Sequence, residues 1–92
     1  MNTINKQRYD QLLQNNITVI DVRSPVEFNK KKYIQTAINV PVYRVSDLYT
    51  KFKKTDPILL ISKNKLDKDL HIMYNYLIQI GYTKVYAYGC EE

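Results

Sequence analysis

The chain has 92 residues, of which 45% are hydrophobic and 25% are charged, which suits one small domain with a single core. Its formal net charge is +5, and its one cysteine and one histidine exclude a disulfide framework and a cysteine-rich zinc site. No apolar run reaches the roughly 18–20 residues that span a bilayer, and the polar N-terminus has no signal-peptide core. We therefore expect a cytoplasmic protein with no membrane segment, metal or cofactor.

Helical and strand patterns alternate along the chain. Helices are predicted where apolar residues recur at i, i+3, i+4 spacing, and strands where short β-branched or apolar runs end at Asn, Asp or Pro. In chain order the predicted elements are a helix over 3–14, a strand over 17–22, a helix from Pro25 with Ser24 as its cap, a strand over 37–40, a helix over 46–54, a strand over 58–61, a helix over 67–80 and a strand over 84–88. This alternation predicts an α/β fold, with a mainly parallel sheet of about four or five strands and helices on both faces.

Several short motifs occur in a fixed order along the chain. They are Asp21-Val22-Arg23, Glu27-Phe28, Ala37-x-Asn39-Val40-Pro41, Pro57 before an apolar strand, and Leu77-x-x-x-Gly81-Tyr82-x-x-Val85. Together they resemble the rhodanese-like (sulfurtransferase) family over about residues 3–90. The resemblance implies a single small rhodanese-like domain over residues 1–92. The family usually continues through Gly-Gly and a closing helix, whereas this chain ends at Glu92, so we expect it to lack that segment.

Three charged residues of the first two motifs have a structural role in the family. The residues that match Asp21, Arg23 and Glu27 mainly hold the scaffold together there. We therefore interpret these three as a buried polar network, and not as groups that contact a substrate.

The strand over 58–61 runs directly into the place where the family has its catalytic cysteine. The resemblance puts Ser62 at that position, and the family's Cys-x-x-Gly-x-Arg loop is replaced by a segment without Cys, Gly or Arg. This vestigial active-site loop comprises Ser62, Lys63, Asn64, Lys65, Leu66, Asp67 and Lys68. Sulfur transfer needs a thiolate of low pKa that backbone N–H groups stabilise, and a hydroxyl forms no equivalent sulfur–sulfur bond. We therefore assign no catalytic residue.

Acidic residues also stand where the following helix begins. Asp67 is a natural N-cap, and Asp67 and Asp69 would repel an anion such as thiosulfate. Three lysines of the same segment act in the opposite direction and leave weak anion binding open, namely Lys63, Lys65 and Lys68. His71 lies in the helix beyond the loop and is interpreted as a surface or boundary residue, not as a catalytic base.

Cys90 is the only thiol of the chain. It is most simply an incidental thiol near the terminus, and Glu91 and Glu92 would raise its pKa. The leading hypothesis is accordingly a non-catalytic binding or regulatory module whose ligand is a partner protein or a small anion. The alternative is a sulfurtransferase or sulfur carrier that works through Cys90 or a partner's cysteine. Nucleic-acid binding is the weakest option, because the lysines are spread along the chain.

Overall fold

The computed structural model describes residues 2–91, and its elements alternate as the sequence predicts. They are α1 (Lys6–Gln14), β1 (Thr18–Asp21), α2 (Pro25–Lys30), β2 (Ile38–Asn39), the 3-10 helix η1 (Val42–Arg44), α3 (Ser46–Tyr49), β3 (Ile58–Ser62), α4 (Lys68–Gln79) and β4 (Val85–Gly89). The main difference is α3, which ends at Tyr49, whereas the prediction extended this helix to residue 54. Among the described residues, none of the helices has the length and apolar character needed to cross a membrane.

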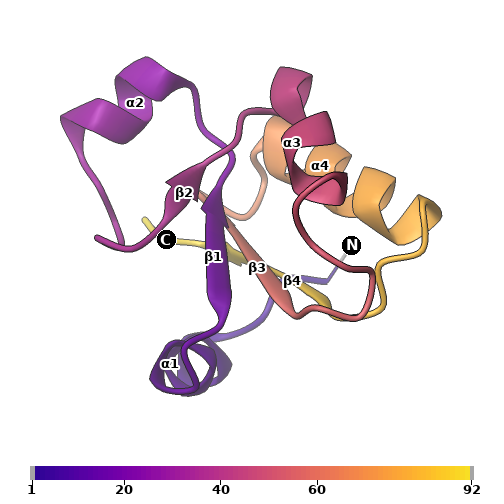
Figure 1. Ribbon diagram of the computed structural model, residues 1–92. Coiled ribbons are helices and arrows are strands. Elements are labelled where there is room, and N and C mark those ends of the chain that lie inside the picture. The colour runs from indigo at the N-terminus through magenta and orange to yellow at the C-terminus, as the bar shows by residue number, and fades with distance from the viewer. Residues whose placement is uncertain (1, 92) are drawn as a thin grey trace.

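The four strands form one parallel sheet in the order β2-β1-β3-β4, as Figure 1 shows. This confirms the predicted α/β class, and the strand count lies at the lower end of the expected range. β3 is central and fully buried along its length, which agrees with its uninterrupted apolar sequence. The N-terminal segment lies against the outer edge of β4, where the Ile4 N–H donates to the Ala87 carbonyl at 2.9 Å.

The sheet is covered on both faces, and alternate residues of each strand enter two separate core clusters. α3 and α4 cover one face, where Leu70, Met73 and Leu77 pack against Ile58 and Leu60. On the other face, α1 packs against the alternate residues of β3, and its Tyr9 and Leu12 cluster with Leu59 and Ile61. Figure 1 shows α1 on one side of the sheet and α3 and α4 on the other.

Four of the predicted helix ends are confirmed, at the starts of α2 and α4 and at the ends of α1 and α4. The Ser24 side chain accepts from the Glu27 N–H at the start of α2, and Asp67 accepts from the Asp69 N–H at the start of α4. Gly81 follows α4 with a φ of 106°, the left-handed conformation that ends a helix at low cost in glycine. Asn16 takes the same role after α1 with a φ of 58°.

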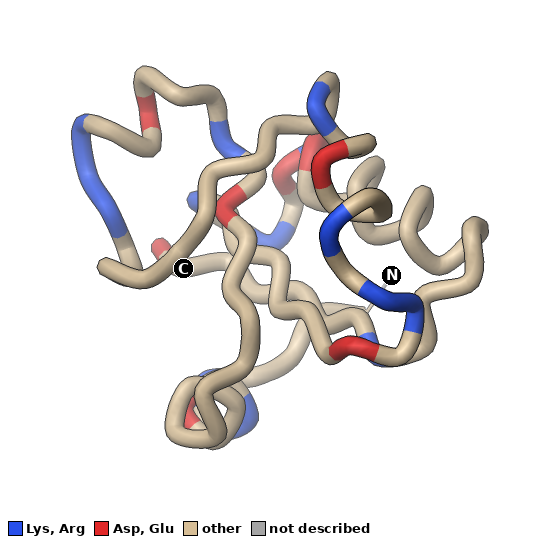
Figure 2. Tube along the Cα trace, viewed as in Figure 1, with Lys and Arg blue, Asp and Glu red and all other residues tan. Residues whose placement is uncertain are grey.

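The positive charge is distributed over several elements. Figure 2 shows Lys and Arg residues in α1, at the end of α2 and in the loop that follows α3. These groups are separated by the sheet and by tan, uncharged segments. In this view the Lys and Arg residues are therefore spread over several elements.

Candidate functional site

The loops after β1 and β3 meet at the carboxyl edge of the sheet, where parallel α/β folds commonly place their ligand sites. A shallow pocket of about 460 Å³ lies between them. Its lining consists of residues from the start of α2 and from the segment before α4, namely Arg23, Ser24, Glu27, Lys63, Asn64, Leu66, Asp67 and Asp69. The structure thus brings most of the vestigial loop next to the Asp-Val-Arg motif.

A buried ion pair forms the floor of this region. The guanidinium of Arg23 donates to both carboxylate oxygens of Asp21, from Nη2 at 2.8 Å and from Nε at 3.0 Å. The remaining donors reach backbone carbonyls of Lys31 at 2.6 Å and of Glu27 at 3.3 Å. The guanidinium also lies over the ring of Tyr33, 4.0 Å from its centroid. Most of the N–H groups of Arg23 are therefore used in holding the scaffold together.

Glu27 takes part in this network only through its backbone. Its carbonyl accepts from Arg23 and its N–H donates to Ser24, while its side chain is exposed. The expectation of a buried Glu27 carboxylate is therefore wrong. The physical reason is that α2 buries none of its residues, so its first turn presents this side chain to solvent.

Asn39 completes the network from β2, a role that the sequence interpretation did not assign. Its side-chain amide donates to the carbonyls of Asp21 at 3.0 Å and Arg23 at 2.8 Å. The available signal was its place in the Ala37-x-Asn39-Val40-Pro41 motif. Asn39 thus ties the chain after β1 to the neighbouring edge strand.

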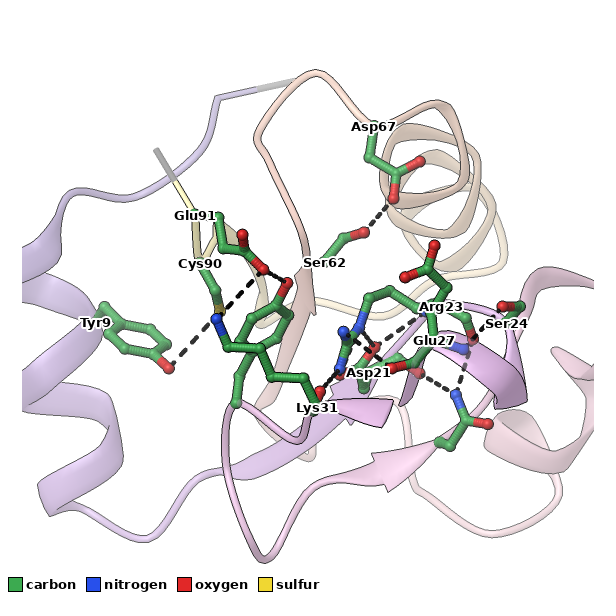
Figure 3. A network of polar contacts seen from close by, with 12 residues as sticks. Tyr9, Asp21, Arg23, Ser24, Glu27, Lys31, Ser62, Asp67, Cys90 and Glu91 are labelled. Atoms are coloured by element: carbon green, nitrogen blue, oxygen red, sulfur yellow. Dashed lines mark hydrogen bonds and ion pairs between the residues drawn. The ribbon is translucent and has the colours of Figure 1, made fainter. Parts of the chain in front are cut away.

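Ser62 and Asp67 contact each other across the loop after β3 (Figure 3). Ser62 is fully buried, and its Oγ donates to one carboxylate oxygen of Asp67. The other oxygen of Asp67 accepts from the Asp69 N–H at 3.1 Å. The N-terminus of α4 is the natural place for a bound anion, and here an internal carboxylate already occupies it.

The rest of the loop is held by local bonds and by β4. Asn64 accepts from the Leu66 N–H at 3.0 Å through its side chain, and its carbonyl accepts from the Asp67 N–H at 3.2 Å. His71 bonds through Nε2 with the Lys65 carbonyl at 2.9 Å, so it holds the loop from α4. The loop also lies directly on Gly89, where an added Cβ would stand 2.3 Å from the Lys65 nitrogen.

The charges around the pocket are mainly acidic. Three carboxylates line it, from Glu27, Asp67 and Asp69. The two cations of the lining are Arg23, which is already paired with Asp21, and Lys63. Of the three loop lysines, only Lys63 lines the pocket. This balance disfavours an anionic ligand.

Cys90 lies at the same edge of the sheet but faces the opposite way from Ser62. Its N–H donates to the Ser62 carbonyl at 2.9 Å, while its side chain packs in the cluster beneath α1. Its Sγ is 3.9 Å from the hydroxyl of Tyr9. Figure 3 shows the two side chains facing each other. Burial raises the pKa of the Cys90 thiol to about 11, with smaller effects from neighbouring charges. The expected increase in the pKa of Cys90 is present, but its main cause is burial and not Glu91. Glu92, the other residue expected to raise it, lies outside the described residues.

Glu91 links the chain end to the segment after α2, a contact that only the fold creates. The hydroxyl of Tyr33 donates to the Glu91 carboxylate, and Lys31 Nζ lies 3.8 Å from the same group. The hydrogen bond from Tyr33 is the largest cause that lowers the pKa of Glu91. The Tyr33 ring that stacks on Arg23 is therefore also held by Glu91, near the C-terminus.

Comparison with known proteins agrees with this geometry. The family model for the rhodanese-like domain matches residues 5–90. No curated protein shows a significant match to the chain. Similar solved structures include a human single-domain sulfurtransferase, with 22% identity over 98% of this chain and 90% of that one and a TM-score of 0.79.

Two further structures have the same fold. A rhodanese-related protein from Thermoplasma volcanium is 21% identical over 98% of this chain and 86% of that one, with a TM-score of 0.76. The reduced CoADR-RHD protein of Bacillus anthracis is 23% identical over 98% of this chain but only 15% of its own length, with a TM-score of 0.78. At these identities the structures show the fold alone, whereas the family model covers nearly the whole chain. The chain therefore belongs to the rhodanese-like domain family.

Proposed function

We propose that this chain is a rhodanese-like domain without sulfurtransferase activity that acts as a protein-binding or regulatory module. The observation that carries the proposal is the hydrogen bond from Ser62 to Asp67 at the end of β3, where the family resemblance puts the catalytic cysteine. A persulfide intermediate requires a thiolate that attacks sulfane sulfur, and a hydroxyl supplies neither the sulfur nor the low pKa. Ser62 is also fully buried, so it presents no nucleophile to the pocket.

The electrostatics of the pocket support a protein ligand over a small anion. Asp67 caps the N-terminus of α4, Asp69 lies in its first turn, and Glu27 adds a third carboxylate to the lining. The donors that would stabilise an anionic sulfur species are thereby already used or opposed by charge. A small anion such as thiosulfate is accordingly the weaker choice of ligand.

The alternative, sulfur transfer through Cys90, has less support. The Cys90 side chain belongs to the cluster under α1, and Cys90 is not among the residues that line the pocket after β3. Its raised pKa of about 11 keeps the thiol protonated near neutral pH, and the protonated thiol is a poor nucleophile. Both properties differ from those of a reactive sulfur carrier.

A thiosulfate:cyanide sulfurtransferase assay tests the proposal, with an active rhodanese as the positive control. The wild-type chain and its Cys90→Ser variant are both expected to form thiocyanate no faster than the uncatalysed reaction. Turnover that survives in Cys90→Ser would show that the loop after β3 is catalytic. Turnover that disappears in Cys90→Ser would instead support the sulfur carrier.

A further inference from the structure

The solvent-facing side of α4 has an unusual composition for a surface helix. The chain contains no Asp, Glu, Lys or Arg between Asp69 and Lys84. α4 nevertheless exposes several large apolar side chains, with Ile72 at 40%, Tyr76 at 38% and Ile78 at 43% of full exposure. A surface helix normally has charged residues opposite its buried stripe. An exposed apolar surface of this kind indicates an interaction site.

Part of this surface joins α3 and is hollow. The ring of Tyr49 lies 6.4 Å from that of Tyr76, and together with Ile80 and Lys54 they line a hollow of about 340 Å³. Ile72 lies one turn before Tyr76 on the same helix face, and Ile80 one turn after it. We call Tyr49, Ile72, Tyr76 and Ile80 the α3–α4 patch.

The hollow is formed before any ligand binds, because the loop after α3 is fixed against the end of α4. The hydroxyl of Tyr82 donates to the Phe52 carbonyl at 2.6 Å, and the Thr83 N–H donates to the Lys54 carbonyl at 3.1 Å. Lys54 in turn donates through Nζ to the carbonyl of Ile80. A preformed hollow reduces the entropy that binding must overcome.

The loop that follows Tyr49 is basic, and its Lys54 lines the hollow. Lys51, Lys53 and Lys54 follow Tyr49 in the chain, and none of the three forms an ion pair with a carboxylate among the residues that the structure describes. Asp56, which accepts from the Lys53 backbone N–H, is the acidic residue of this loop. Figure 2 shows this basic loop beside the uncharged second half of α4. The patch therefore combines an apolar hollow with local positive charge.

We propose that the α3–α4 patch is the docking surface for an acidic segment of a partner protein, which inserts an aromatic or aliphatic side chain into the hollow. The inference rests on the proposed protein-binding function and gives it a location. Acidic residues beside the inserted side chain would face Lys54, and Lys51 and Lys53 of the same loop would add to the local positive charge. A second copy of the chain would bring two basic loops together, so charge complementarity favours an acidic partner.

The test is a selection of phage-displayed random peptides on the immobilised full chain, followed by fluorescence anisotropy with the recovered peptides. These peptides are expected to combine Asp or Glu with an aromatic or aliphatic residue. Tyr76→Ala and Lys54→Glu should each weaken binding by about tenfold or more. The matched controls are Ile78→Ala, an exposed residue of α4 outside the patch, and Lys30→Glu in α2, and both should bind within about twofold of wild type.

Thermal unfolding of each variant shows whether a loss of binding reflects unfolding, and Tyr49→Ala replaces Tyr76→Ala if the latter does not fold. The proposal is overturned if no peptide is recovered, if the peptides lack acidic residues, or if they bind Tyr76→Ala as well as wild type. It is also overturned if Tyr76→Ala dissociates a dimer or abolishes binding to phosphatidylserine vesicles, since the patch would then serve a second copy or a membrane. Sulfurtransferase activity with intact peptide binding would contradict only the absence of catalysis.

Discussion

The guanidinium of Arg23 folds back on the carboxylate of Asp21, two residues earlier in the chain, and both side chains are almost completely removed from solvent. Asp21 is the last residue of β1, so the pair closes the carboxyl end of that strand. Because the remaining donors of Arg23 reach the Glu27 and Lys31 carbonyls, this side chain joins the end of β1 to the middle of α2 and to its C-cap. The ion pair therefore stabilises the fold beside the pocket and does not supply an unpaired charge to it.

Replacement of Arg23 by Ala is expected to reduce the free energy of unfolding by about 3–5 kcal/mol, because it leaves the Asp21 carboxylate buried without a partner. Glu27→Ala is the matched control and should cost less than about 1 kcal/mol, since its side chain is exposed. Urea denaturation of the two variants measures both values. Equal losses would mean that the Glu27 carboxylate belongs to the network after all.

Gly89→Ala is expected to destabilise the fold by about 3 kcal/mol or more, because the new Cβ would overlap the backbone of the loop at Lys65. Gly81→Ala provides a comparison, since its Cβ would meet only the flexible side chain of Lys54, at 3.3 Å. This second change should cost about 1 kcal/mol, from the left-handed backbone. Thermal and urea unfolding of both variants test the ranking. A harmless Gly89→Ala substitution would show that the loop does not pack on β4 in solution.

Alkylation of Cys90 by iodoacetamide should be slow at neutral pH and should accelerate with pH up to about 11. Burial raises the pKa of the thiol, so the reactive thiolate is scarce below that value and its population grows about tenfold per pH unit. The control is the unfolded chain in urea, whose alkylation rate should level off near the pKa of a free thiol, about 8.5. A native rate that levels off below pH 8 would identify Cys90 as an activated thiol and favour the sulfur carrier.

Introduction of a thiol at Ser62 should not restore sulfur transfer. The pKa of the new thiol in Ser62→Cys is expected above the free value of about 8.5, because the site is buried and the Asp67 carboxylate is adjacent. The double variant with Asp67→Asn keeps a side-chain cap for α4 and removes that charge, so its thiol pKa should be lower than in the single variant. Thiolate absorbance as a function of pH measures both. A pKa well below 8.5 in Ser62→Cys alone would show a loop that still stabilises a thiolate.

The sequence alone determined the order and type of the elements and most of their ends. The apolar run that begins at Ile58 predicted a central buried strand because parallel strands covered on both faces need no polar alternation. Ser24, Asp67 and Gly81 marked helix ends. Ser and Asp side chains accept from free N–H groups at a helix start, and glycine readily adopts the left-handed conformation that follows a helix. The motif around Asp21 and Arg23 indicated the buried pair only through the family resemblance, since the matching residues hold the scaffold together in that family.

Tertiary structure decided the properties of the candidate site. The exposure of Glu27 follows from how α2 lies outside the core, which its helical pattern does not specify. The opposite orientation of Ser62 and Cys90 depends on strand register, since neighbouring positions along paired strands face different sides of the sheet. The contact of Tyr49 with Tyr76 joins two helices that β3 separates in the chain. Local sequence fixes backbone conformation, but which distant side chains meet depends on packing of the whole sheet and its helices.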